Sequence, residues 1–389
     1  MEPVETEDFL ARIWEREPLA VARDEPGRFD DLLSLADVER ALTSGGLRLP
    51  GFRLVKAAER LAASDYTATL SWRPLPFSGM ADVPRVLREI ERGATLVLQA
   101  LHHTHAPLAA FCRELEAALG QPAQANAYFT PRRSQGLPVH HDTHDVLCLQ
   151  VAGEKRWQVY EPALELPLRN QRYGPELGAP GEPVLDLVLR PGDTLYLPRG
   201  WLHQALTSET DSLHLTIGVN VHTWLDALRA ALDACADDVE FRRSVPEDGE
   251  MEADLLERLR ARLEPEAVRR RARGRLVSTR RPVLEGQLSE LLALDELTVA
   301  TPLERRPTVL ADLDGSALLL EGKRVEFPRH AAGALEAAFA VETPFCAADL
   351  PGSLDEAGRL VLVRRLVREG FLRRSAAGDG AAPTSRSDT

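Results

Sequence analysis

The sequence has few cysteines and no long apolar run, and both absences exclude classes of protein. Its four cysteines, among 389 residues, form no CxxC pair, so they have neither the spacing of a zinc cluster nor that of a disulfide framework. No apolar run approaches the roughly 20 residues that cross a bilayer. The acidic start at residues 1–8 also lacks the basic and then apolar layout of a signal peptide. We therefore expect a cytoplasmic protein with reduced thiols and no membrane segment.

The chain also lacks an excess of basic residues. Its 47 Lys and Arg stand against 60 Asp and Glu, a formal net charge of −13. Binding along a phosphate backbone requires a basic face, so we do not expect direct contact with nucleic acid. The basic run at residues 268–275 is interpreted as a solvated helix face. An acidic surface suits a basic polypeptide substrate, and it also maintains solubility.

The hydropathy pattern changes along the chain and predicts an α+β protein with several domains. Residues 1–92 contain helical periodicity and are predicted to form a helical lead-in. Residues 93–222 contain short apolar runs bounded by Pro and Gly, such as 146–151 and 194–197, with one helix at 108–119. Closely spaced short strands of this kind are typical of a β-barrel or sandwich.

The second half of the sequence returns to helical patterns. Residues 223–297 contain charged amphipathic helices, which outside a main core often serve dimerisation. Residues 298–374 contain short strands, three helical segments and a terminal hairpin, the layout of a winged helix. The last long helix of this region mixes acids and bases. We therefore interpret residues 298–374 as an interaction domain without DNA contact. The segment 375–389 is poor in apolar residues and is predicted to be disordered.

The first motif with chemical content is GLPVHHD at residues 136–142. Side chains alternate along an extended segment. His140 and Asp142 are therefore predicted to point to one side, while His141 points to the other.

The second motif is RPGDTLYLPRGWLH at residues 190–203. Its Pro-Gly-Asp makes a tight turn, Thr-Leu-Tyr-Leu forms a strand, and Pro-Arg-Gly-Trp bends the chain so that His203 enters from a neighbouring strand. His140, Asp142 and His203 are thus predicted to form a metal-binding set of two histidines and one carboxylate.

Such a set covers one face of an iron(II) ion and leaves positions for a chelating co-substrate and dioxygen. Zinc accepts the same ligand types, so the three ligands alone do not identify the metal, and the residues around them have to be considered. The cluster His102, His103 and His105 follows a predicted strand and is interpreted as part of a barrel rim or loop. His144 and His214 are interpreted as hydrogen-bonded histidines of the core or rim.

A dicarboxylate co-substrate needs a cation at its far end, and Lys155 and Arg156 follow the strand after the first motif. Because they alternate, at most one of them points into the barrel. Two surface charges on a hairpin are an equally good interpretation of the pattern. Upstream, Asn126 and Tyr128 are two residues apart, so on a strand their side chains lie on the same face. They are candidates to place an amide and a phenol inside the barrel.

These residues resemble a known family, the JmjC/cupin ribosomal oxygenases, which use iron(II) and 2-oxoglutarate to hydroxylate ribosomal proteins. The resemblance extends over nearly the whole chain, through the motifs at 9–19, 126–131, 140–142, 153–160, 190–203 and 212–216. It implies a double-stranded β-helix core of the jelly-roll, cupin or JmjC type. It also implies a helical dimerisation segment and a C-terminal winged-helix domain.

The resemblance also implies roles for individual residues. Two features depart from the family: His141 stands where the family often has an aromatic residue, and the loop at 204–211 is short. Both affect the expected substrate more than the chemistry. The implied iron(II) ligands are His140, Asp142 and His203; Lys155 pairs with the distal carboxylate of 2-oxoglutarate, Asn126 and Tyr128 line the pocket, and Thr216 lies nearby.

The function implied is hydroxylation of an arginine or histidine side chain of a ribosomal protein by a homodimer that consumes dioxygen and 2-oxoglutarate. Three other substrates suit the same chemistry: a precursor peptide of a natural product, a small molecule, and a methyl-lysine that would be demethylated. A non-enzymatic metal-binding cupin regulator is the alternative from another class. It predicts tight zinc binding, no succinate, and salt-dependent DNA affinity.

Overall fold

The computed structural model describes residues 3–23, 25–44, 46–57, 59–72, 75–247 and 253–375. The chain divides into two compact units, one formed by Met1–Glu116 and Gln121–Val221, the other by Ala117–Gly120 and His222–Thr389. The tail predicted to be disordered at 375–389 lies, except for Ser375, outside the described residues. Within the described ranges, no helix combines the length and apolar character needed to cross a membrane.

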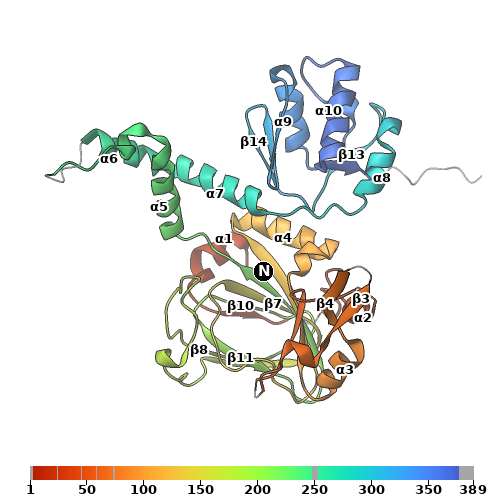
Figure 1. The fold of residues 1–389 in the computed structure, drawn as a ribbon, viewed down its shortest axis with the longest axis vertical. Helices are drawn as coiled ribbons and strands as arrows, with labels where there is room; N and C mark the ends of the chain where they lie inside the picture. The colour runs from red at the N-terminus through yellow and green to blue at the C-terminus, as the bar shows by residue number, and fades with distance from the viewer. Residues whose placement is uncertain are drawn as a thin grey trace, which may run out of the picture. The chain divides into compact units, whose positions relative to one another are not determined.

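Two antiparallel sheets form the first unit (Figure 1). Residues from both sheets, including Cys148, Leu195 and Trp157, share one hydrophobic cluster, so the sheets pack face to face. The larger sheet runs in the order β1 (Leu19–Val21), β10 (Thr194–Leu197), β7 (Asp145–Gly153), β12 (Ser212–Val219), β6 (Ala123–Thr130), β5 (Thr95–Leu98) and β2 (Phe52–Val55). The smaller sheet runs in the order β11 (Leu202–Leu206), β8 (Lys155–Tyr160) and β9 (Leu185–Leu189).

Strand β12 is buried along its whole length because both of its faces are covered. Leu213, Leu215 and Ile217 belong to the main hydrophobic core on one face. His214 and Thr216 alternate with them and line a cavity between the sheets. The centre of the larger sheet thus separates the core from the cavity.

Helices and one hairpin complete the first unit. The predicted helical lead-in is incomplete, because β1 and β2 from that region join the larger sheet. Both strands pair with partners that are distant in the sequence, and a local pattern does not show such pairing. The other elements are α1 (Thr6–Asp8), the π-helix Phe9–Ile13, α2 (Leu35–Thr43), α3 (Val83–Glu91), α4 (Ala106–Leu119), and the hairpin β3 (Thr67–Trp72) and β4 (Leu75–Ala81).

A buried polar network connects the start of the chain to β7, to β10 and to the bend that follows β10 in the second motif. Arg199, whose side chain is 5% exposed, pairs with the fully buried Asp145 at 3.0 Å and also with Glu15. The Tyr196 hydroxyl donates to Asp145 at 2.8 Å and accepts from the Glu15 backbone N–H at 2.9 Å. Because each buried charge has a partner, the bend before His203 is held by polar contacts as well as by packing.

The second unit begins with helices and ends with a mixed region. The predicted terminal hairpin is wrong: β17 pairs with β13, far away in the sequence, rather than with an adjacent strand. The winged-helix assignment and the division at 297 stay predictions. The elements are α5 (Trp224–Asp233), α6 (Ala253–Arg262), α7 (Pro265–Thr279), α8 (Gln287–Leu292), β13 (Leu303–Arg305), the sheet β14 (Ala311–Asp314), β15 (Ala317–Leu320) and β16 (Lys323–Glu326), then α9 (Ala332–Ala340), α10 (Glu356–Glu369) and β17 (Leu372–Arg374).

Single 3₁₀ turns join many of these elements. They are η2 (Ala63–Asp65), η3 (Leu101–His103), η4 (Pro175–Leu177), η5 (Ala234–Asp237), η6 (Val239–Arg242), η7 (Leu294–Glu296), η8 (Arg329–Ala331) and η9 (Ala347–Asp349).

Candidate metal centre

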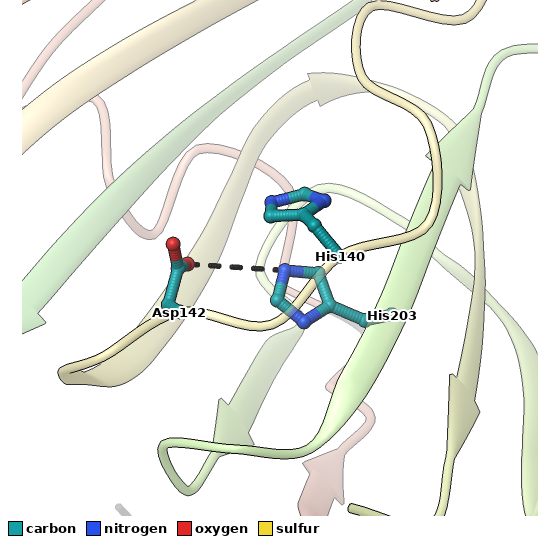
Figure 2. Close-up of side chains that lie close together, drawn as sticks. All are labelled: His140, Asp142 and His203. Carbon is teal, nitrogen blue, oxygen red and sulfur yellow. Dashed lines mark ion pairs between the residues drawn. The ribbon is translucent and has the colours of Figure 1, made fainter. Parts of the chain in front are cut away.

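The structure brings together the three residues that the motifs predict as a metal-binding set. His140 and Asp142 come from the segment between β6 and β7, and His203 comes from β11. One potential ligand atom from each of the three lies within 4.8 Å of the others, and Figure 2 shows the side chains converging. His203 Nε2 and Asp142 Oδ2 are 3.8 Å apart.

His140 is held against His203 by the backbone. The two residues form an isolated antiparallel bridge, with the His203 N–H donating to the His140 carbonyl at 2.8 Å and the reverse bond at 3.1 Å. This pairing sets the ring centroids 4.5 Å apart. Two histidines 63 positions apart are therefore presented side by side.

Both imidazoles are oriented by backbone carbonyls. His140 Nδ1 lies 2.8 Å from the Pro138 carbonyl, and His203 Nδ1 lies 3.0 Å from the Trp201 carbonyl. A ring that donates its Nδ1 proton keeps its lone pair on Nε2 and presents that atom as a ligand. The three residues therefore fit a divalent transition-metal ion, with two neutral nitrogens and one carboxylate on one side.

Electrostatics keep the set in the protonation state that a metal requires. Burial opposes ionisation of Asp142, but His144, His203 and His140 outweigh it and hold the Asp142 pKa below its usual value. Burial and the neighbouring His140 lower the pKa of His203. At neutral pH the carboxylate is thus charged and the His203 ring neutral.

The set faces a cavity with about 490 Å³ of empty space, part of it open to solvent. His141 points away from it, as the alternation predicts: its ring packs on Tyr173 and its Nε2 lies 3.0 Å from the Gln171 carbonyl. The cavity lining is Thr95, Tyr128, Gly136, Leu137, His140, Asp142, Val146, Cys148, Lys155, Trp157, His203, Ala205, His214 and Thr216.

Lys155 is a buried cation in this cavity. It is 4% exposed, and its Nζ donates to Thr130 Oγ1 at 2.9 Å. Among the described residues no carboxylate pairs with it, and burial lowers its pKa to about 7. Its neighbour Arg156 points outward and pairs with Asp186, so only one of the two enters the barrel. A buried ammonium without a counter-charge is unfavourable, and a bound carboxylate would stabilise it.

Tyr128 and Thr216 line the cavity, but Asn126 does not. The Asn126 Oδ1 atom accepts a hydrogen bond from the Ala100 backbone N–H at 2.9 Å, where the chain is left-handed, and its predicted role at the pocket stays a prediction. Tyr128 stacks on His214 with centroids 5.0 Å apart. Burial raises the pKa of Tyr128 to about 12, so its phenol remains a hydrogen-bond donor.

Sequence reasoning missed His214 and Thr130. His214 is 3% exposed and lines the cavity, although it was interpreted as a core or rim histidine. Its place two residues before Thr216 on one strand is the signal that would have turned it inward. The cluster at 102–105 has structural contacts: His102 Nδ1 accepts from the Ala125 N–H at 3.2 Å, and His105 Nε2 lies 3.0 Å from the Leu32 carbonyl.

A cavity between two antiparallel sheets with two histidines and one aspartate on its wall defines the class of double-stranded β-helix metalloproteins. Residues 100–227 match the family model described as JmjC domain. The matched residues thus have the JmjC/cupin-type fold, and the JmjC/cupin core predicted from the motifs is confirmed.

Similar proteins narrow the class further, and the predicted resemblance to ribosomal oxygenases is confirmed. The chain is 32% identical to human Ribosomal oxygenase 1 over 255 residues, which cover 63% of this chain and 38% of that protein. It is 32% identical to rat Ribosomal oxygenase 2 over 256 residues, 63% of this chain and 52% of that protein. The chain thus aligns with about half or less of the length of these relatives.

A further relative is the Bifunctional lysine-specific demethylase and histidyl-hydroxylase NO66 of Drosophila persimilis, 32% identical over 216 residues, 55% of this chain and 30% of that protein. Among solved structures, the Escherichia coli ribosomal oxygenase YcfD in complex with cobalt and 2-oxoglutarate has a TM-score of 0.61 at 20% identity, covering 95% of this chain and 98% of YcfD. At that identity the likeness concerns the fold.

Proposed function

We propose that this protein is an iron(II)- and 2-oxoglutarate-dependent oxygenase that hydroxylates a histidine or arginine side chain of a ribosomal protein. One observation carries the proposal: the oriented His140, Asp142 and His203 set and the unpaired Lys155 ammonium face the same cavity. A metal ligand set alone suits many proteins. A buried cation beside it suits a chelating dicarboxylate.

Different residues of the cavity have different roles in the proposed reaction. His140, Asp142 and His203 would hold iron(II), which when bound supplies the site of dioxygen activation. Lys155, oriented by Thr130, pairs with the distal carboxylate of 2-oxoglutarate. Apolar lining, including Val146, Leu137 and Ala205, excludes water from the reacting groups. The Tyr128 phenol and the Thr216 hydroxyl offer hydrogen bonds in the same space.

The similar proteins support the substrate class. Two curated relatives have the name Ribosomal oxygenase, and a third is named as a histidyl-hydroxylase. YcfD is described in complex with cobalt and 2-oxoglutarate, and also with cobalt and succinic acid, the product of 2-oxoglutarate turnover. We propose the same co-substrates, including dioxygen, for this chain, and a cytoplasmic location.

The proposed assembly is a homodimer formed through the helical segment 223–297. Its first helix, α5, exposes Trp224, Leu228 and Leu232, which are 80%, 45% and 57% accessible. Apolar side chains of this size along one helix are typical of a surface covered by a partner. The C-terminal region is proposed as a winged-helix interaction domain without direct nucleic-acid contact, since the chain is acidic overall.

Anaerobic reconstitution with iron(II) tests the function. Wild-type protein should convert 2-oxoglutarate to succinate, and a ribosomal protein should gain the mass of one oxygen atom on a histidine or arginine. His140→Ala should abolish both, while His330→Ala, at an exposed histidine of the second unit, should change neither. Mass spectrometry distinguishes hydroxylation from loss of a methyl group. Failure of wild-type protein to bind iron or 2-oxoglutarate would contradict the proposal.

A further inference from the structure

The segment that leads to His140 bulges away from its neighbour β11. Isolated antiparallel bridges join Gln135 to Leu206 and His140 to His203. These bridges are five positions apart on the segment but three positions apart on β11, so the segment has extra residues to accommodate. Residues 136 and 137, within this bulge, line the cavity. The conformation of the bulge therefore decides where the cavity wall lies and how His140 is presented.

The Gln135 side chain holds the bulge from within. Its Nε2 donates to the Leu137 carbonyl at 3.0 Å and to Gln204 Oε1 at 3.1 Å. The next carbonyl along the chain, that of Pro138, lies 2.8 Å from His140 Nδ1. The backbone that Gln135 fixes is thus continuous with the backbone that orients the His140 ring.

Gln204 ties this bulge to the smaller sheet. Its two neighbours on β11 line the cavity, so alternation turns the Gln204 side chain to the other face of the sheet. Its Nε2 donates to Gln158 Oε1 and to the Tyr160 hydroxyl oxygen, both at 2.9 Å. Gln158 Nε2 in turn donates to Asp186 Oδ2 at 3.1 Å. We call Gln135, Gln204, Gln158 and Asp186 the amide network.

The acid at one end sets the direction of every hydrogen bond in the amide network. Hydrogen bonds from Arg156 lower the pKa of Asp186 to about 2, so its carboxylate is ionised at neutral pH and only accepts. Gln158 therefore turns its N–H₂ group to Asp186 and its oxygen to Gln204. Gln204 must then donate to Gln158 and present its own oxygen to Gln135. The Gln135 N–H₂ group is thereby directed to both the Gln204 oxygen and the Leu137 carbonyl.

We propose that Gln204 is a positioning residue, which acts through Gln135 on the bulge and thereby orients the metal ligand His140. This inference rests on the proposed function, since that function makes His140 a ligand. Loss of a group that orients a metal-binding histidine typically weakens metal binding by about 10- to 100-fold. Gln204 lies on the face of the sheet away from the cavity, so it would influence the metal without touching it.

Replacement of Gln204 by leucine tests the positioning role through metal affinity. Gln204→Leu removes the acceptor for Gln135 and the donor for Gln158, so the affinity for cobalt(II) should fall about tenfold or more. Isothermal titration calorimetry measures this affinity without turnover. Gln99→Leu, at a half-buried glutamine of the first unit outside the amide network, is the matched control and should bind cobalt like wild-type protein.

The direction of the amide network provides a rescue test. Gln204→Glu keeps the shape of the side chain but sets a carboxylate against the Gln158 oxygen, so it should also weaken cobalt binding. Adding Asp186→Ala frees the Gln158 amide to turn and donate to the new carboxylate. Cobalt affinity should then return to within about threefold of wild type, and Asp186→Ala alone should bind like wild type. Removal of a carboxylate weakens cation binding by charge alone, so such a recovery reports the reoriented amide.

The metal-free protein provides a second readout. At about pH 8, nitrogen NMR of histidine-labelled wild-type protein should show His140 protonated at Nδ1, the atom that faces the Pro138 carbonyl. Gln204→Leu should show a mixture of the two tautomers, and His140→Ala assigns the signals. A role in stability alone would lower the melting temperature and leave the tautomer unchanged. Gln204→Glu, which has the wild-type shape, replaces the leucine variant in this measurement if that variant does not fold.

The outcomes separate the two proposals. Unchanged cobalt affinity in the Gln204 variants, an unchanged His140 tautomer, or a double variant that binds cobalt no better than Gln204→Glu overturns the positioning role. Each of these results keeps the proposed function as long as wild-type protein binds cobalt and 2-oxoglutarate. A wild-type protein that binds neither overturns the proposed function, and the tautomer in the metal-free protein then still decides whether Gln204 orients His140.

Discussion

In the proposed site, the protonation of Lys155 and the binding of 2-oxoglutarate should depend on each other. Burial lowers the pKa of Lys155 to about 7 in the free protein, and a paired carboxylate would raise it again. The ammonium form binds the anion, so the affinity for 2-oxoglutarate should fall as pH rises above about 7. At most, the affinity for 2-oxoglutarate should fall tenfold for each pH unit, until the pH reaches the pKa that Lys155 has in the complex.

The comparison with Lys155→Arg isolates this effect. A guanidinium stays charged at all relevant pH values, so the affinity of the variant for 2-oxoglutarate should depend little on pH. Titrations of the cobalt-loaded protein at about pH 6.5 and about pH 8.5 measure the difference. Equal pH dependence in the wild type and the variant would show that Lys155 does not pair with the co-substrate.

At the level of elements, the network of Arg199, Asp145 and Tyr196 joins β7 to β10 and to the bend that follows β10 in the second motif. Asp145→Ala would leave the Arg199 side chain, 5% exposed, with Glu15 as its remaining acidic partner. Removing one partner of a buried ion pair costs about 3 kcal/mol or more. We expect calorimetry to show a fall of about 6 to 12 °C in the melting temperature of the first unit.

Two further variants calibrate that result. Tyr196→Phe removes one hydrogen bond to Asp145 and one from the Glu15 N–H, so it should destabilise less, by about 1 to 2 kcal/mol. Asp186→Ala removes an exposed carboxylate paired with Arg156 and should have a negligible effect. If Asp145→Ala melts like Asp186→Ala, the buried network does not hold the strands together.

The same elements show which parts of the fold the sequence could predict. Strands β5, β7, β8, β9, β10 and β12 appear where apolar runs are bounded by Pro and Gly, because that signal is local. Strands β1 and β2 were missed because they gain their stability from partners that are distant in the sequence. The predicted pairing of β17 in a terminal hairpin was wrong for the same reason, because its partner β13 is distant in the sequence.

The metal set was predictable because its geometry is encoded locally, in the alternation around Asp142 and the bend before His203. Asn126 shows the limit of that reasoning. Alternation along β6 predicts on which face the Asn126 side chain lies. It does not predict the hydrogen-bond donor, the Ala100 N–H, which belongs to a turn 26 residues earlier.

At the scale of the whole molecule, the proposed homodimer depends on the exposed face of α5. Leu225, Leu228 and Leu232, at 37%, 45% and 57% exposure, recur at helical spacing and so share one face. Placing a charge among apolar side chains that a partner covers is strongly unfavourable. Leu228→Glu combined with Leu232→Glu should therefore weaken self-association by about a hundredfold.

Size-exclusion chromatography with light scattering measures this change directly. Wild-type protein should elute at twice the mass of one 42.9 kDa chain and the double variant at that of one chain. Val361→Glu is the matched control, because it introduces the same charge at an apolar residue of α10 that is 68% exposed. The substituted leucines lie on α5 in the second unit, whereas His140, Asp142 and His203 belong to the first unit, so 2-oxoglutarate binding should survive the loss of the dimer. A monomeric wild-type protein would contradict the proposed homodimer. A double variant that remains dimeric would show that the dimer forms through another surface.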